Sequence, residues 1–135
     1  MELGKAFTLS TLGLKAQDAR MKVIAENLAN ANTVSGSDGA DPYRRKIVAF
    51  KQMVDEDSGI KGVAVSGILG DKSDFPTKYD PGNPSANSEG FVRTPNVNPL
   101  IEVMDMRDAQ RSYEANLTMM EASKAMLQKT IDLLK

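Results

Sequence analysis

The chain has 135 residues and a formal charge of −1, from 17 basic and 18 acidic side chains, and it contains no histidine, cysteine or tryptophan. A nearly neutral chain lacks the basic field that attracts nucleic acid or anionic membranes, and no apolar stretch approaches the length of a membrane span. We therefore expect no nucleic acid among its partners and no direct membrane insertion. Without cysteine and histidine, disulfides, thiolate metal sites and the commonest acid-base catalysts are excluded, and we expect no cofactor.

The first part of the chain, residues 1–33, predicts a helical arm. We expect a helix that begins between Phe7 and Ser10 and ends near Asn30, because this stretch is rich in strong helix formers. Asparagine tolerates left-handed backbone and bonds to its own backbone neighbours, so Asn30 and Asn32 are expected to close the helix and start a turn. Heptad spacing then predicts one stripe on this helix, formed by Phe7, Leu14, Gln17, Met21, Ile24, Leu28 and Ala31.

Residues 34–99 predict a region of loops and short strands. All six prolines and most of the glycines lie in this region. Two strand candidates, Tyr43–Met53 and Ile60–Leu69, can pair as a hairpin across Asp55–Gly59. Beyond them we expect no regular structure except a short extended segment at Phe91–Arg93.

The last part, residues 100–135, predicts the strongest helix, about Leu100–Leu134, after Pro95 and Pro99 have held the preceding segment away from helix. Its repeat at alternating spacings of three and four lasts more than four heptads, which indicates a coiled coil and requires a partner helix. The predicted fold is therefore mainly α, with long N- and C-terminal helices that pack in coiled-coil fashion as one structural unit and a loop-rich middle containing a small β-hairpin. The stripe of the last helix comprises Val103, Met106, Gln110, Tyr113, Leu117, Met120, Lys124, Leu127, Ile131 and Leu134.

The sequence contains no catalytic or nucleotide-binding motif, and we expect no enzyme activity. The acidic run Asp55–Asp57 lacks the glycine and glutamate positions of an EF-hand, so a solvated hairpin turn is the favoured interpretation. The basic run Arg44–Lys46 is interpreted as a solvated strand face in preference to a phosphate-binding patch. The methionines of the last helix suit core filling and an adaptable partner surface equally well.

The segment Glu26–Thr33, with Met21–Ala25 before it, resembles the N-terminal signature of bacterial flagellar rod and hook proteins, the axial-protein family. Three further stretches are similar to the proximal-rod members of that family. They are Asp41–Arg45, Gly90–Pro99, and Arg111–Asn116 followed by Lys124–Leu133. The resemblance implies a structural subunit of the basal-body proximal rod, which polymerises into a helical tube and transmits motor torque.

The resemblance also implies partners and a location. Family members assemble with copies of themselves, with other proximal-rod subunits, with the basal-body adaptor protein FliE and with the distal rod. They reach the periplasmic rod through the flagellar type III export apparatus, unfolded and without a cleaved signal peptide. A soluble helical adaptor or export chaperone that binds a partner helix through the same heptads is the alternative. The residues expected to make the helix packing and assembly contacts are Leu14, Met21, Ile24, Leu28, Asn27, Asn30, Asn32, Tyr113, Leu117, Met120, Leu127, Ile131 and Leu134.

Overall fold

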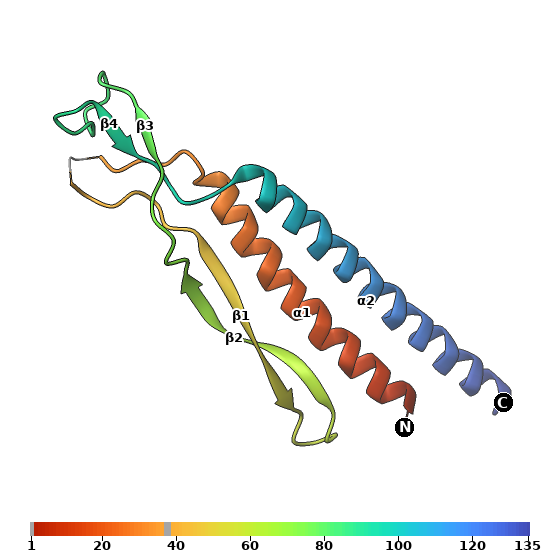
Figure 1. Ribbon diagram of the computed structural model, residues 1–135. Helices are drawn as coiled ribbons and strands as arrows, with labels where there is room; N and C mark the ends of the chain where they lie inside the picture. Colours follow the sequence, from red (N-terminus) through yellow and green to blue (C-terminus); the bar gives the residue numbers. More distant parts are fainter. Residues whose placement is uncertain (1, 37–38) are drawn as a thin grey trace.

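The computed structural model describes residues 2–36 and 39–135 and shows an elongated molecule built on two long helices that lie side by side (Figure 1). The first and last helices run in opposite directions, so the two chain termini lie at the same end (Figure 1). A long hairpin lies along the first helix, and a smaller one sits at the end opposite the termini (Figure 1). The prediction of two packed terminal helices around a loop-rich middle with a hairpin is confirmed. The elements are α1 (Glu2–Ala29), β1 (Lys46–Val54), β2 (Lys61–Gly70), β3 (Thr77–Tyr79), β4 (Phe91–Arg93) and α2 (Pro99–Leu133).

Helix α1 begins at Glu2, which corrects the expected start between Phe7 and Ser10. Packing against α2 stabilises this first part of α1 beyond what local propensity predicts. Glu2 also places a negative charge in the first turn, where the helix dipole favours it. At the other end, the amide of Asn30 still donates to Glu26 O at 3.1 Å, and Thr33 N donates to Asn30 O in the turn that follows.

Helix α2 starts one residue earlier than expected because Pro99 occupies its first turn instead of delaying it. Asn98 is the N-cap, and its side chain accepts a hydrogen bond from Leu100 N at 3.1 Å. Proline suits this position because the first helical amides have no partner within the helix. With 35 residues, α2 is about 52 Å long, whereas the 28 residues of α1 span about 42 Å. Among the described residues, no helix is both long and apolar enough to cross a membrane.

Strands β1 and β2 form the predicted hairpin. They pair antiparallel from Lys46↔Gly70 to Val54↔Lys61, with a bulge at Ala49/Phe50. Asp55 shapes the turn, since its Oδ1 accepts hydrogen bonds from the amides of the two residues that close it. This carboxylate is therefore a turn former, and no group of three or more potential metal ligands occurs in the described part of the chain.

The small sheet β3–β4 corrects the sequence interpretation in part. The extended segment Phe91–Arg93 was expected, but its partner β3 was not, because three exposed residues carry no periodic pattern. Gly90 precedes β4 with φ +84°, and a Cβ there would lie 2.9 Å from Tyr79, so the tight turn requires glycine.

Candidate assembly surfaces

A polar network joins the end of α1 to the start of β1. Asn27 is 1% exposed, and its side chain bonds to both backbone groups of Lys46. Its Nδ2 donates to Lys46 O and its Oδ1 accepts from Lys46 N, each at 2.9 Å. Tyr43 donates its hydroxyl to the same Oδ1 at 2.9 Å. The side chain of Asn27 therefore bonds to both backbone groups of one strand residue, as the backbone of an adjacent strand does, and holds the base of the hairpin against α1.

The same network reaches α2 through a buried carboxylate. Glu102, in the first turn of α2, is 0% exposed. It accepts hydrogen bonds from Arg45 Nε and, at 3.3 Å, from Asn27 Nδ2. Arg45 also pairs with Asp71 at 3.3 Å and Asp105 at 3.6 Å. A buried carboxylate is tolerated only when it is paired and hydrogen-bonded, so this cluster holds the two helices in one relative position.

The charges of the cluster shift one another's pKa values. Burial by itself lowers the pKa of Arg45, but the hydrogen bond and charge of Glu102, with those of Asp71, outweigh it and raise the pKa. The backbone amide and the hydroxyl of Ser73 lower the pKa of Asp71, and Arg45 lowers it further. Both groups thus keep their charges over a wider pH range than free side chains do.

Asn96 connects this network to the end of β2. Its Oδ1 accepts from Arg45 N at 2.7 Å and its Nδ2 donates to Asp71 O at 3.2 Å. Arg44 donates to the same carbonyl and lies over the Phe75 ring, 4.3 Å from its centre. The interpretation of Arg44–Lys46 as a solvated strand face is therefore wrong for Arg44 and Arg45, whose guanidinium groups bond within the chain. Lys46 is half exposed and pairs with Glu26 at the surface.

The α2 side of the seam between the two helices is formed by small and polar residues. A Cβ on Gly13 would lie 2.7 Å from the Asn116 side chain, so glycine lets the two helices approach closely. The buried positions of α2 are Glu102, Ala109 and Ser123. Each precedes a residue of the predicted stripe, and one residue turns a helix by about 100°. Most of the apolar stripe of α2 therefore lies on the flank of the seam, and Met120 still contacts Thr11 of α1.

The thirteen predicted assembly residues differ in exposure. Two are buried, Ile24 and Asn27. Half-buried residues lie along the two helices, and among them Asn30 donates its side-chain amide to Glu26 O at 2.9 Å at the end of α1. The others of this group are Leu14, Met21, Leu28, Tyr113, Leu117 and Met120. The exposed residues are Asn32, after α1, and Leu127 (51%), Ile131 (43%) and Leu134 (84%) at the C-terminal end of α2.

The structure also reveals network residues that the sequence interpretation did not identify. Glu102, Arg45, Asp71 and Asn96 lie far apart in the chain, and no motif links them. The position of Glu102 in an otherwise apolar first turn was a weak sign that this carboxylate is buried. Its partner Arg45 could not be identified from the sequence, because the fold brings the two together.

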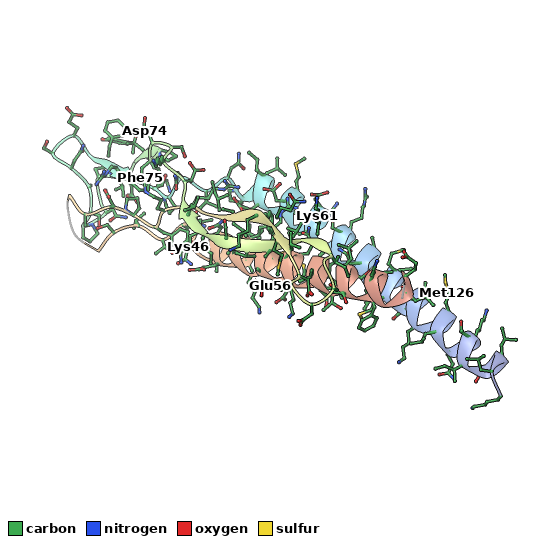
Figure 2. The ribbon with its side chains drawn as sticks, turned by 90° about the horizontal axis from the view of Figure 1, so that it is seen from below. Lys46, Glu56, Lys61, Asp74, Phe75 and Met126 are labelled. Atoms are coloured by element: carbon green, nitrogen blue, oxygen red, sulfur yellow. The ribbon has the colours of Figure 1, made fainter. Side chains whose placement is uncertain are left out.

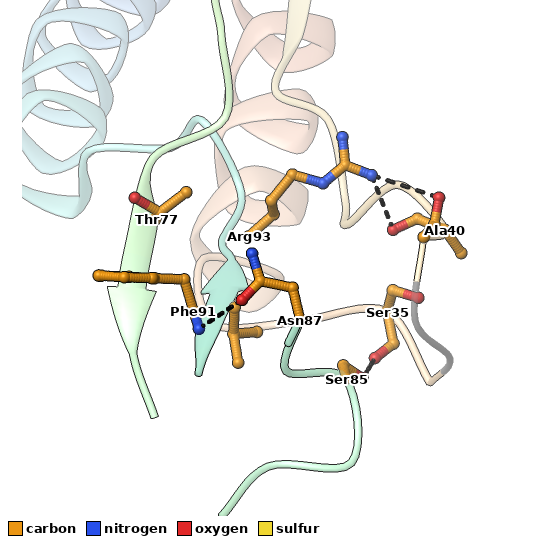
Figure 3. A pocket seen from close by; sticks show the side chains of 9 residues that line it. Ser35, Ala40, Thr77, Ser85, Asn87, Phe91 and Arg93 are labelled. Atoms are coloured by element: carbon orange, nitrogen blue, oxygen red, sulfur yellow. Dashed lines mark hydrogen bonds between the residues drawn. The ribbon is translucent and has the colours of Figure 1, made fainter. Parts of the chain in front are cut away.

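A hollow at the tip of the molecule is lined by residues that make hydrogen bonds within the chain. Figure 3 shows Arg93 donating to the carbonyl of Ala40 and Asn87 accepting from Phe91 N. Ser85 donates to Ser35 O. These bonds join the loop after α1 to the β3–β4 sheet, so we assign the polar groups of the hollow a structural role.

Both ends of the chain match models of flagellar proteins. Residues 10–36 match the family described as "Flagella basal body rod protein", and residues 88–133 match "Flagellar basal body rod FlgEFG protein C-terminal". An antiparallel pair of terminal helices with unpartnered apolar flanks fits this class, the subunits of the flagellar rod.

Full-length relatives narrow the class. The chain is 46% identical to the flagellar basal-body rod protein FlgC of Agrobacterium fabrum, over 98% of this chain and 96% of that protein. It is 41% identical to FlgC of Bacillus subtilis, over 95% of each chain, and 38% identical to FlgC of Escherichia coli O6:H1, over 98% of each. The chain belongs to the FlgC family of flagellar basal-body rod proteins. It is a structural protein and not an enzyme, and membership of this family implies assembly with rod subunits.

Proposed function

We propose that this chain is a subunit of the proximal rod, where it assembles into a helical tube that transmits motor torque. Its neighbours are copies of itself, other proximal-rod subunits, the adaptor protein FliE and the distal rod. It reaches the periplasmic rod unfolded through the type III export apparatus, without a cleaved signal peptide.

The observation that carries this proposal is where the apolar side chains lie. The buried positions of α2 are small or polar, whereas its large apolar side chains lie half-buried or exposed beside them. Burial of such side chains is worth roughly 1.5–3 kcal/mol each, so a surface stripe of them favours association. Long helices buried on several sides by neighbours resist twisting, as torque transmission requires.

The test is complementation of a flagellated bacterium that lacks its own subunit of this family. Expression of this chain is expected to restore swimming, and isolated basal bodies are expected to contain it. A flank variant, Tyr113→Asp, should be exported but absent from rods, because a charge replaces a half-buried ring. Lys22→Glu, on the exposed side of α1, is the matched control and should assemble normally.

The adaptor alternative makes the opposite prediction. An adaptor would form a stable small oligomer and would not enter the rod. If purified basal bodies lack the wild-type chain while it forms a soluble complex with another flagellar protein, the rod assignment fails.

A further inference from the structure

A groove runs along α1 between the long hairpin and α2. In the described part of the chain, β1 and β2 pack on α1 and not on α2, so one strip of α1 lies open between them. The middle of this groove has a volume of about 470 Å³, which leaves room for several large side chains. Its lining is small or apolar apart from two amides: Leu9, Gly13, Ala16, Gln17, Phe50, Val63 and Asn116.

The groove contains a polar atom without a bonding partner. Among the described residues, Gln17 Oε1 is a buried side-chain oxygen with no hydrogen-bond donor. Buried polar atoms of native proteins are almost always satisfied, because an unpaired one costs free energy. The Gln17 side chain lines the groove, so an occupant that is mainly apolar and carries an N–H or O–H donor can satisfy Oε1 once this amide turns toward the groove.

The C-terminal end of α2 has these properties. Leu127 shares a hollow with Leu3 and Phe7, close to the start of α1, and α2 continues beyond that point (Figure 2). We call the segment from Gln128 to Lys135 the overhang. It bears exposed Ile131 and Leu134 together with the donor side chains of Gln128 and Lys129.

We propose that the overhang of one copy docks in the groove of a second copy of this chain. The contact cannot form within one copy, because the overhang points away from α1 while the groove lies alongside it (Figure 2). The lengths are similar, since the overhang has eight residues, helical up to Leu133, and the rise of α1 from Leu9 to Gln17 is about 12 Å. This inference rests on the proposed function and names one contact of the assembly.

The symmetry of this contact follows from its two different surfaces. A segment that inserts into an unlike site makes a heterologous contact, which extends along a series of subunits instead of closing into a pair. Two turns of helix bury far less than the roughly 800 Å² per partner of a standard interface. Each contact is therefore weak, and copies in solution associate through it only at high concentration.

Paired variants test this geometry. The groove variant Val63→Glu and the overhang variant Ile131→Glu/Leu134→Glu change exposed positions, and Met104→Glu, distant from both surfaces, is the control. Sedimentation velocity of the full chain at rising concentration should show open-ended association of the wild type and the control. Each test variant should lose at least ten-fold in association, and a 1:1 mixture should form dimers, because one groove and one overhang stay intact.

Three results would overturn the proposal. They are a wild type that stays monomeric, test variants that associate like the wild type, and a mixture that forms no dimers. Gln17→Met supplies a second readout. Association should fall about ten-fold because the donor of the overhang loses its acceptor, whereas the monomer should unfold at the same or a higher denaturant concentration. Unchanged association would contradict the role of Gln17.

Cross-linking separates this proposal from the proposed function. The chain has no cysteine, so in a mixture of Val63→Cys copies and Leu134→Cys copies every disulfide joins two introduced thiols. Copies that carry tags of different mass distinguish the mixed product from a disulfide between two identical variants. A disulfide between two copies is expected in assembled rods, whereas Val63→Cys with Glu114→Cys, on the outer side of α2, should give none. Complemented rods in which the overhang pairs with a different rod protein, or with nothing, would defeat the docking proposal and leave the rod function intact. Failure of the wild-type chain to enter rods would defeat the rod function.

Discussion

The two ends of the helix pair are stabilised in different ways. At the junction end, α1, β1 and α2 meet in a buried network around Asn27, Arg45 and Glu102, whose main polar atoms have partners within the chain. At the terminal end, α2 extends past α1 and exposes Ile131 and Leu134, large apolar residues with no counterpart on α1. The polar groups of the junction end are paired within the chain, whereas the apolar side chains of the terminal end are left for a neighbouring chain to bury.

This difference fits a subunit that must fold alone and then polymerise. Hydrogen bonds and ion pairs are directional, so the junction sets the angle between the helices. Apolar contacts are non-directional and need only a complementary surface, so the terminal end can accept another chain. The comparison yields four predictions for the isolated chain, ordered from the largest effect to the smallest.

The largest effect is expected when the junction loses its cation. Arg45→Met keeps the aliphatic stem but leaves Glu102 buried without its main partner, which should lower the free energy of unfolding by about 3–5 kcal/mol. Lys46→Met is the control, because the pair of Lys46 with Glu26 is about 40% exposed, and its loss should change stability far less. Urea unfolding followed by circular dichroism measures the stability of both variants. Equal losses of stability would show that the buried network does not stabilise the junction.

The second prediction compares an apolar residue from each end. Ile24 is 5% exposed and lies beside the junction, so Ile24→Ala should cost about 2–5 kcal/mol. Leu127 is half exposed in the single chain, so Leu127→Ala should cost less than about 1.5 kcal/mol. The same urea unfolding experiment measures both losses, at a concentration where the chain is monomeric. A larger loss at Leu127 would mean that the terminal end is as self-contained as the junction.

The third prediction concerns the close approach of the helices. Gly13→Val places atoms where the Asn116 side chain lies, and this overpacking should cost about 1–3 kcal/mol. Gly4→Ala is the matched control, since a Cβ there meets nothing within 4 Å. It should raise stability by up to about 1 kcal/mol through helix propensity. Combining Gly13→Val with Asn116→Ala should recover part of the lost stability. No recovery would show that the added side chain does not clash with Asn116.

The smallest effect is a pH dependence at the junction. Because its folded-state pKa is lowered, Asp71 contributes stability that is fully present above its unfolded pKa of about 3.9. That contribution is lost as the pH falls through the lower folded-state value. The stability difference between the wild type and Asp71→Asn should therefore be constant at neutral pH and shrink below about pH 4. Thermal unfolding at a series of pH values measures it, and a difference that does not shrink in acid would rule out Asp71 as its source.

Local patterns predicted most of the fold. Heptad spacing located both long helices, and the glycine between two apolar runs located the long hairpin. The start of α1 and strand β3 were missed because each depends on packing with a distant segment. The junction was missed for the same reason, since Arg45 and Glu102 are 57 residues apart.

The sequence by itself determined the class of elements, the family and the presence of a long apolar stripe on α2, because these properties depend on residues close together in the chain. Only the tertiary structure decided whether that stripe packs against α1 or lies at the surface. Periodicity alone assigns the apolar residues to the contact between the helices. In the structure, Gly13, Ala109 and Ser123 lie at that contact, because small side chains allow the closest approach of the helices. The large apolar residues are thereby turned to the flank and to the overhang, where a neighbouring subunit can bury them.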